Sequence, residues 1–396
     1  MPPPQSRSLS RSAVLTVLMS GRQLERNQIV ERTGLSRATV FRAVDELRNQ
    51  GSVRDVTLPA PAGRGRPPVG VQLVSDAGQV CGVDLGGTNC RFVVADLLGR
   101  AIRVDRQRTP RERAAPALAR WILDRIRQLS DGTVPAAIAV GLPGALSGDA
   151  SQVFGSQNLP QIVGTTFISS LVDEAPAPVV VENDSNLALT GELRYGALAR
   201  EATVSLVAIG TGLGTAAAIG GSVLRADDGR LGEFGRLNMP GSKLRLRDLV
   251  SGAGLIRYAQ ECGVDLADPR ELFAAPERYP GLHRQVVDAL VHLVAIVALA
   301  YEPRSILLTG GLTQGFDRAL INRVASDATE IVGVPIDLAH SSLGDNSGLY
   351  GAMAAALNRA YTGLGISSAD LGRVEVDRVA VTDSVAVLNR SAADGG

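Results

Sequence analysis

Residues 79–99 read QVCGVDLGGTNCRFVVADLLG, and this stretch decides the fold because two apolar segments meet at a Gly-Gly-Thr turn. Both segments alternate in polarity, which predicts a strand, a tight turn and a second strand. Asp84 stands at the end of the first strand, just before Gly86, Gly87 and Thr88. A carboxylate there can hold Mg²⁺ or its water shell, and glycines let backbone N–H groups approach phosphate oxygens. A tight hairpin without a ligand would give the same pattern, so both interpretations remain open.

The same arrangement recurs in residues 204–221, VSLVAIGTGLGTAAAIGG. The predicted turn contains Gly210, Thr211, Gly212 and Gly214. Two glycine-turned hairpins in one chain indicate an internal duplication that clamps one polyphosphate between two lobes. A further turn, in SILLTGGLTQG, places Gly310 and Gly311 after a buried strand, where a nucleotide base or ribose can rest.

Three segments between the hairpins carry polar residues at turns: AVGLPGAL with Gly144, SQNLP with Asn158, and VVVENDSNLALTGE with Asn183 and Asp184. Asp184 follows an all-valine strand and begins a predicted helix. An aspartate in this place can act as general base toward a hydroxyl group. It can also be a helix N-cap, a position at which aspartate is common. Judged from this residue alone, the cap is the favoured interpretation.

The first seventy residues predict a DNA-binding module. Helical spacing covers residues 11–20 and 25–33, and Ser36 caps a third helix that stops at Gly51. Two helices joined by TGLS are typical of a helix-turn-helix, whose second helix enters the major groove. The side chains at its start, Ser36, Arg37, Thr39 and Arg42, are candidates for contacts with bases and phosphates. An ordinary three-helix bundle with a solvated basic face is the alternative.

Two predicted strands, SVRDVTL and VGVQLV, follow these helices and enclose PAPAGRGRPP. This tip carries Arg64 and Arg66, and arginines on an extended arm suit the narrow minor groove of A·T-rich DNA. The sequence therefore predicts a winged helix with an RGRP arm, although a bare linker would have a similar composition.

Charge and composition support a modular protein of 396 residues. Residues 1–70 hold 11 arginines against 5 acidic residues, whereas the remainder holds 29 basic and 35 acidic residues. This asymmetry indicates a nucleic-acid module on a mildly acidic body, unless it is only drift in composition. We expect no apolar run near the ~18 residues of a membrane span, no secretory leader and no paired cysteine motif. The prediction is therefore a cytoplasmic protein without a membrane partner.

The motifs DLGGTN, GLPG, ENDSNLALTGE, IGTGLGTA, LGEFG and LLTGG resemble, in order and interval, those of the ROK family (repressor, open reading frame, kinase). The resemblance covers residues 10–362. It implies an α/β, two-lobed, actin-like sugar-kinase fold with ribonuclease H-like sheets, preceded in the regulator branch by a winged helix-turn-helix. The expected domains are residues 1–70 and 71–362, with lobe one about 78–185 plus 349–362 and lobe two about 186–348. Residues 363–396 lie outside it, and their weak alternation predicts a small strand element or a loose tail.

The resemblance also implies roles for individual residues. In family kinases Asp84 would help place Mg²⁺ and the transferring phosphate, and the two glycine turns would hold the phosphates. Asp184 would take the proton from the sugar hydroxyl, while Asn158, Asn183 and Glu233 would hold other hydroxyls. Gly144 of GLPG would pack beside the sugar, or belong to a lobe-crossing loop only.

The stretch LGEFGRLNMPGSKLRLRDLVSG, residues 231–252, departs from the family pattern. Arg236 stands where the family has histidine, and the zinc-binding CxCGxxGC loop is missing, so no zinc is predicted. Counting back from Ser251, a sugar-binding glutamate is replaced by Arg247. Because arginine only donates hydrogen bonds and prefers carboxylates and phosphates, an anionic effector is one interpretation. The slightly favoured alternative is that both arginines point outward and form salt bridges in place of the zinc.

The favoured function is a DNA-binding transcriptional regulator, expected to be a repressor of carbohydrate-related genes. A homodimer or dimer of dimers would bind a two-fold operator, and a carbohydrate or anionic sugar derivative would bind in the cleft. The alternative is an ATP-dependent sugar kinase with Asp184 as base. ATP and Mg²⁺ would be needed only in that case, and DNA binding would need no cofactor.

Overall fold

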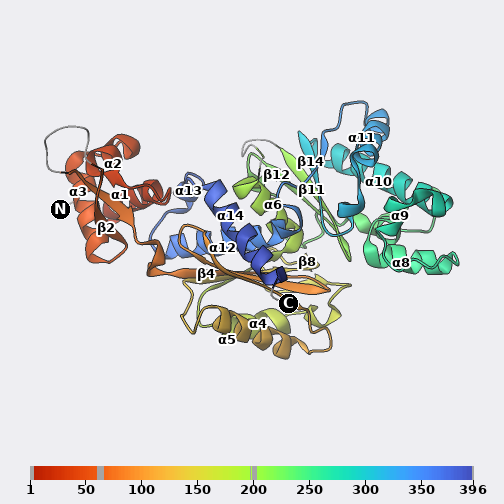
Figure 1. Cartoon of the computed structure of the whole chain (residues 1–396), viewed down its shortest axis with the longest axis horizontal. Coiled ribbons are helices and arrows are strands. Elements are labelled where there is room, and N and C mark those ends of the chain that lie inside the picture. Colours follow the sequence, from red (N-terminus) through yellow and green to blue (C-terminus); the bar gives the residue numbers. More distant parts are fainter. Residues whose placement is uncertain (1–3, 60–66, 197, 199–202, 395–396) are drawn as a thin grey trace.

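The computed structural model describes residues 4–59, 67–196, 198 and 203–394. Three parts follow one another along its longest axis (Figure 1). The N-terminal module forms one end, the second lobe forms the other, and the first lobe lies between them. The arm with Arg64 and Arg66 lies outside the described residues.

The N-terminal module contains three helices and a small antiparallel sheet. Its elements are α1 (Pro4–Leu18), α2 (Arg26–Thr33), α3 (Arg37–Asn49), β1 (Leu24–Glu25), β2 (Val53–Thr57) and β3 (Val69–Leu73), with strand order β1-β3-β2. The predicted helices and strands are confirmed, and α1 begins earlier than expected. The Ser36 hydroxyl accepts from the Thr39 N–H at 3.2 Å, so it caps α3 as predicted.

Lobe one is a mixed five-stranded sheet with helices on both faces. Its strands are β4 (Gln79–Leu85), β5 (Asn89–Asp96), β6 (Ala101–Arg108), β7 (Ala137–Leu142) and β10 (Val179–Asn183), in the order β10-β7-β4-β5-β6. One face packs on α4 (Ala115–Leu129) and α5 (Thr166–Glu174), and the other packs on α12 (Ser347–Gly363). Cys81 and Val83 of β4 point to the first face, and Val80 points to the second. Gly82 lets α12 approach closely, because a Cβ there would lie 2.7 Å from the Met353 nitrogen.

Lobe two repeats this plan with a second five-stranded sheet. Its strands are β11 (Val204–Ile209), β12 (Leu213–Ile219), β13 (Ser222–Val223), β14 (Ser305–Thr309) and β15 (Leu338–His340), in the order β13-β12-β11-β14-β15. The outer face packs on α7 (Leu246–Leu249), α8 (Gly252–Glu261), α10 (Pro280–Tyr301) and α11 (Arg318–Val332). The inner face packs on α6 (Asp184–Tyr195). Both predicted glycine-turned hairpins are present, as β4–β5 and β11–β12.

The expectation that no stretch is long and apolar enough for a membrane span needs a correction. Helix α10 meets that test by length and composition, with 22 residues. Within its most apolar 18-residue window, 61% is buried inside the protein, where α10 forms the core of lobe two. A buried core helix of a large domain is apolar for this reason.

Helices α6 and α12 form a shared layer between the two sheets. They cross where neither helix has a side chain: a Cβ on Gly191 would lie 2.4 Å from the Ser347 oxygen, and one on Gly351 would overlap the Leu187 oxygen. Glu192 of α6 is fully buried, and its carboxylate accepts from Ser341, from the Ser342 hydroxyl at 2.8 Å and from the Leu343 N–H at 2.9 Å. The layer is therefore tied to the loop that leads into α12.

The C-terminal prediction of a strand element or loose tail is wrong. The chain forms α13 (Ser368–Leu371) and α14 (Arg378–Asp394), and α14 packs on β6 and α6. Val381 and Val385 are buried, and the Ser384 hydroxyl accepts from the Ala101 N–H at 2.9 Å. Valines four residues apart lie on one face of a helix, and this spacing outweighs the weak alternation.

Short elements lie in the connections between these helices and strands. They are β8 (Ala145–Leu146), β9 (Val153–Gly155), α9 (Glu271–Ala274) and the 3-10 turns η1 (Ser75–Ala77), η2 (Pro160–Ile162), η3 (Phe234–Arg236), η4 (Pro276–Arg278), η5 (Thr313–Gly315) and η6 (Gly344–Asn346).

Candidate functional site

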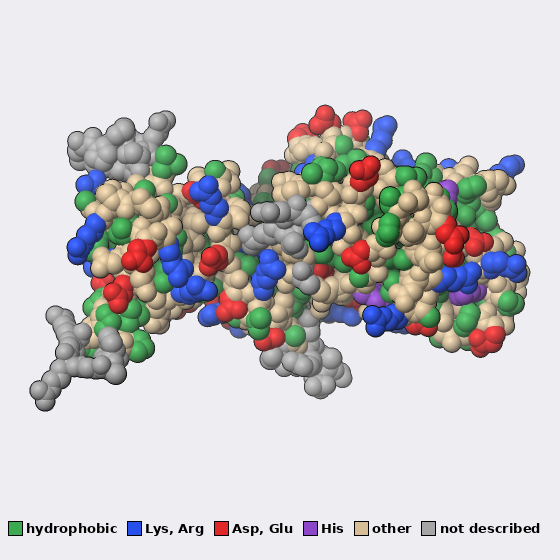
Figure 2. Space-filling view, turned by 90° about the horizontal axis from the view of Figure 1, so that it is seen from above, with side chains coloured by type: hydrophobic (Ala, Val, Ile, Leu, Met, Phe, Trp, Pro, Cys, Tyr) green, Lys and Arg blue, Asp and Glu red, His purple; other side chains and the backbone are tan. Residues whose placement is uncertain are grey.

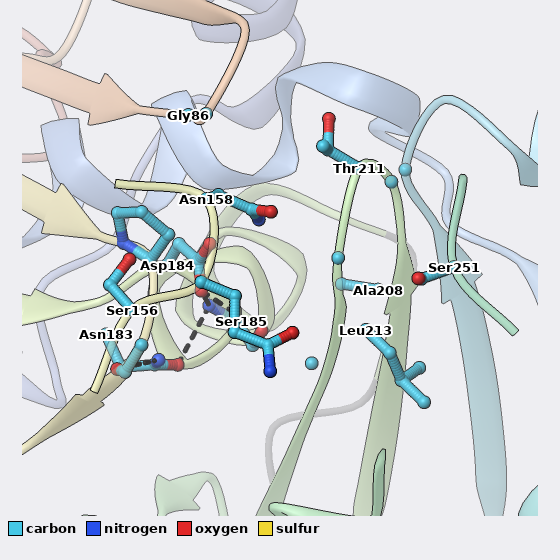
Figure 3. A pocket seen from close by; sticks show the side chains of 18 of the residues that line it. Gly86, Ser156, Asn158, Asn183, Asp184, Ser185, Ala208, Thr211, Leu213 and Ser251 are labelled. Carbon is cyan, nitrogen blue, oxygen red and sulfur yellow. Dashed lines mark hydrogen bonds between the residues drawn. The ribbon is translucent and has the colours of Figure 1, made fainter. Parts of the chain in front are cut away.

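A cleft of about 1400 Å³ lies between the lobes, and it brings together every cleft residue singled out in the sequence. These are Asp84, Gly86, Gly87, Thr88, Gly144, Asn158, Asn183, Asp184, Gly210, Thr211, Gly212, Gly214, Glu233, Arg236, Arg247, Gly310 and Gly311. Figure 3 shows Asn158, Asn183 and Asp184 on one side, facing Thr211 and Leu213 on the other. The walls carry both acidic and basic side chains.

The two glycine turns meet across the cleft. The hydroxyl oxygens of Thr88 and Thr211 lie 3.2 Å apart, so the β4–β5 turn contacts the β11–β12 turn. Asn158 fills the space beside this contact. A Cβ on Gly87 would lie 2.6 Å from its Cβ, and one on Gly212 would lie 2.8 Å from its Nδ2. Gly87 is therefore needed for this close approach, whereas a Cβ at Gly212 would only displace the amide end of the asparagine side chain.

The N-terminus of α8 holds the second turn in place. The N–H groups of Gly252 and Ala253 donate to the carbonyls of Gly210 and Thr211, at 2.8 and 3.1 Å. The Ser251 hydroxyl caps the same helix by accepting from the Gly254 N–H. These helix N–H groups are therefore bound to protein atoms and do not face the cleft as a free anion site.

Asp184 is the first residue of α6, and the neighbouring Asn183 is the N-cap. The Asn183 side chain accepts from the N–H groups of Ser185 and Asn186, and it donates to the Gly144 carbonyl at 2.9 Å. The capping alternative therefore applies to Asn183, which leaves Asp184 directed toward the cleft (Figure 3). Asn183 serves first to fix this helix start.

The electrostatics of the cleft favour a protonated carboxyl at Asp184. Burial raises its pKa to about 7, and the nearby Asp84 and Glu233 add to this, against the opposing hydrogen bonds from Ser185. The pKa of Asp84 is also raised by burial, although Arg91 opposes the shift. Two partly buried carboxylates at the base of one cleft repel each other, so a cation or a proton there is stabilised.

Arg91 of β5 connects Asp84 with the loop before α12. Its guanidinium lies 3.8 Å from the Asp84 carboxylate and 3.9 Å from that of Asp345, and it donates to the Asp345 carbonyl. Gly348, in the first turn of α12, packs on the Asp84 carboxylate, since a Cβ there would lie 3.1 Å from its Cγ. The start of α12 is thus a wall of the cleft.

The two arginines that replace the family residues have different surroundings. Arg236 pairs with Glu233 at 3.2 Å, and its side chain is 53% exposed. Arg247 is half-buried, and among the described residues no carboxylate lies within 4.0 Å of its guanidinium. Its partner is the amide oxygen of Gln157, in the amide orientation that satisfies both groups.

Several cleft residues were not singled out in the sequence. Gln157 stands beside Asn158 in the SQNLP segment, and Arg245 and Arg257 join Arg247 on the lobe-two wall. Glu182 accepts from Arg225 and so links the lobes. Gln157, Glu182 and Arg245 lie in stretches quoted above, but the contacts of Gln157 and Glu182 depend on how the lobes fit together.

No group of three or more histidine, cysteine, aspartate or glutamate side chains suited to a metal ion occurs in the described part of the chain.

The residues predicted to face DNA lie at the start of α3. Ser36, Arg37 and Arg42 are exposed and Thr39 is half-buried. The guanidinium groups of Arg26 and Arg37 lie 5.0 and 5.2 Å from the ring centre of Phe41. Figure 2 shows Lys and Arg side chains at this end of the molecule.

Comparison with known proteins gives one consistent family. A family model described as the ROK family matches residues 80–359. A glucokinase of Streptomyces coelicolor is 27% identical over 308 residues, which cover 69% of this chain and 96% of the glucokinase. A xylose repressor of Caldicellulosiruptor bescii is 25% identical over 236 residues, or 58% of each chain.

A solved structure matches nearly the whole chain. It is a ROK family transcriptional regulator, described as a homologue of the E. coli MLC protein, with a TM-score of 0.70 at 18% identity. The match covers 92% of this chain and 99% of the regulator, and at this identity it shows the fold alone. The two lobes therefore have the actin-like sugar-kinase fold that kinases and regulators share.

Proposed function

The chain belongs to the ROK family, and from this premise we propose that it is a DNA-binding transcriptional regulator, acting as a repressor, whose cleft binds a carbohydrate effector. The family includes sugar kinases and repressors, so the proposal depends on what this chain adds to the shared fold. The addition is the N-terminal module, which we interpret as a winged helix-turn-helix. The match to the regulator structure supports this interpretation, because it covers too much of the chain to leave the module out.

The observation that carries the proposal is the continuous packing between the module and lobe one. Val14 and Leu18 of α1 share one hydrophobic core with Met353 and Leu357 of α12. Side-chain packing of this kind resists independent movement of the two parts. Effector-driven movement of the lobe would therefore be passed to the DNA-contacting helix.

Helix α12 provides the route. It begins beside Asp84 in the cleft and runs to Gly363, just before the segment that contacts α1. There the Ser12 hydroxyl donates to Asp370 at 2.5 Å and accepts from the Ser367 N–H at 2.9 Å. A ligand shifts DNA affinity only if it binds the two conformations with different affinity. Movement of α12 upon lobe closure supplies such a difference.

The cleft suits a small polyhydroxylated effector. Carboxylates of Asp184 and Glu233 and the amide of Asn158 offer acceptors and donors within one cavity.

In a two-fold dimer the two N-terminal modules would contact half-sites about one helical turn apart. A palindromic operator is the expected DNA partner.

The kinase alternative is supported by one specific observation. A carboxyl whose pKa lies at about 7 is suited to act as general base near neutral pH, and Asp184 has this property. In such a reaction Asp84 and the two glycine turns would hold Mg²⁺ and the phosphates, which the family's kinases use, and the cation would supply charge neutralisation. Asp184 would then accept the proton of the attacking hydroxyl.

The proposal is tested with duplex DNA selected from a random library by the full-length protein. Arg37→Ala and Arg42→Ala should each weaken binding of that duplex by about ten- to a hundredfold, as loss of a base or phosphate contact does. Fluorescence anisotropy measures the affinities. Arg120→Ala, on α4 and away from the module, should bind as the wild type does. Equal affinity of all four proteins would reject this DNA surface.

The kinase alternative is tested by ADP release with Mg²⁺-ATP and a panel of hexoses, pentoses and N-acetylated amino sugars. Sugar-dependent release that Asp184→Asn abolishes would establish the alternative. The regulator account expects DNA binding to persist in that variant, because Asp184 lies in the cleft and not in the module.

A further inference from the structure

One wall of the cleft holds a group of arginines that the acids around it do not neutralise. The group is Arg236, Arg245, Arg247 and Arg257, all of which line the cavity. The acids that pair with members of this group are Glu233 and Asp248, while Asp268, which also lines the cavity, pairs with Arg270. Four cations against these two carboxylates leave a net positive charge on a concave wall, which attracts anions, and Arg247 is the half-buried member of the group, since the other three are exposed.

Among the described residues, the ion pairs leave two of these guanidinium groups without a carboxylate partner: that of Arg245, which is exposed, and that of Arg247, which is half-buried. Glu233 pairs with Arg236 at 3.2 Å. Asp248 accepts from Arg257 at 3.0 Å with one oxygen and from the Arg245 N–H at 2.9 Å with the other. Both carboxylate oxygens of Asp248 therefore bind groups other than the Arg247 guanidinium, although Asp248 directly follows Arg247 in the chain. The salt-bridge alternative concerned Arg236 and Arg247, and it applies to Arg236 but not to Arg247, whose contact is with an amide.

Arg247 has no carboxylate within 4.0 Å of its guanidinium in the part of the chain that the structure describes. In the Gln157 amide orientation that satisfies both groups, both terminal nitrogens of the guanidinium donate to the amide oxygen, one of them at 3.1 Å. Gln157 belongs to lobe one, so this neutral contact reaches across the cleft. Burial and then the charge of Arg245 lower the pKa of Arg247, and Arg236 and Arg257 act in the same direction, whereas the charge of Asp248 opposes them. A guanidinium in this field gains from an anion that replaces the amide.

The position of the group also orients a ligand. Asp84 and Asp184 form an acidic region at the base of the cleft, where burial favours a proton or a cation. Arg247 stands against the η3 turn, where a Cβ on Gly235 would lie 3.2 Å from its Cβ. An anion is repelled by the first region and attracted by the second. A ligand with hydroxyls at one end and a charge at the other therefore has one favourable orientation.

We infer that the effector of this cleft is an anionic carbohydrate, a sugar phosphate or a sugar acid, whose oxyanion binds Arg247 in the field of Arg236, Arg245 and Arg257. That the bound carbohydrate acts as an effector rests on the proposed function, but the anion site itself is independent of DNA binding. The anion takes the place of the Gln157 amide on the guanidinium. The hydroxyl groups of the bound carbohydrate face Asn158 and Asp184.

The anion site is tested first with inorganic phosphate on the full-length protein. Phosphate should raise Tm relative to chloride at matched ionic strength, and Arg247→Gln should abolish this rise. Arg323→Gln is the matched control, because Arg323 lies on α11 of the same lobe, pairs with Asp327 and does not line the cleft. A rise that persists in Arg247→Gln, or no rise in the wild type, overturns the inference.

Calorimetric titration then separates the two sources of the oxyanion. Glucose, mannose and galactose are each compared with their 6-phosphates and their uronates. Binding of a phosphate or a uronate should exceed that of the neutral sugar and fall about ten- to a hundredfold in Arg247→Gln, the range for a charge-assisted hydrogen bond. Tight binding of a neutral hexose, with none of its charged derivatives, contradicts the inference.

The outcomes also distinguish the two proposals. Anion binding that depends on Arg247 in a protein that selects no duplex rejects the regulator but retains the site. Selection of a specific duplex by a protein that binds neutral sugars only rejects the site but retains the regulator.

Discussion

The Asp184 carboxyl is held in the cleft at a cost in free energy that depends on pH. Its folded pKa of about 7 lies above the ordinary value of 3.8, and burial is the first cause. For an acid with a raised pKa, stability falls as the pH rises from the unfolded pKa to the folded one, and it changes no further above. The cleft retains this carboxyl although the fold would be more stable without its charge, which is typical of a functional group.

Asp184→Asn should therefore stabilise the protein, and the gain should grow from pH 5 to pH 8. A difference on the order of 2 kcal/mol at pH 8 follows from the shift, reduced for partial exposure. Thermal unfolding of both proteins at the two pH values measures it. Asp124→Asn, on the exposed face of α4, should show no such trend. A Tm difference that is the same at pH 5 and pH 8 would show that Asp184 is not protonated near neutrality.

At the scale of elements, the contact between α6 and α12 depends on glycine. Gly351→Ala places a Cβ on the Leu187 carbonyl oxygen, and backbone atoms cannot move aside as a flexible side chain can. We expect a loss of at least about 2 kcal/mol in the free energy of unfolding, as for overpacked cores. Gly363→Ala is the control in the same helix, since nothing lies within 4 Å of its Cβ position. Urea unfolding that gives equal midpoints for both variants would contradict the close packing.

The C-terminal elements couple the module to the lobe. Ser12→Ala removes the hydroxyl that joins Asp370 and the Ser367 N–H, at an expected cost of about 1 kcal/mol. The larger effect should be on coupling: the effector should change the DNA affinity of the variant less than that of the wild type. Anisotropy titrations with and without the ligand found by calorimetry measure this. An unchanged ligand effect would show that the signal takes another path.

At the scale of the whole molecule, local patterns predicted local structure well. The alternation around Gly86 and Gly212 defined both hairpins, and Ser36 defined the start of α3. Residues 378–394 failed because a short apolar pattern was read with the period of a strand although its valines have helical spacing. Propensity cannot decide such a segment, since packing on β6 and α6 fixes its conformation.

The candidate site was predictable in its members but not in its contacts. All the motif residues line one cleft, because turns at the ends of strands gather where the two sheets face each other. The pairing of Gln157 with Arg247 joins residues ninety positions apart on different lobes. Similarly, the capping of α6 by Asn183 rather than Asp184 depends on backbone geometry that the residue types do not determine.

The most direct test of the central claim is the affinity of the full-length protein for its selected duplex and for the same duplex with a shuffled sequence. Both are measured by anisotropy at about 150 mM salt, where nonspecific binding is weak. A sequence-specific regulator should prefer the selected duplex by about a thousandfold or more. Equal affinity for the two duplexes would contradict the account and leave the cleft to be explained as a kinase site.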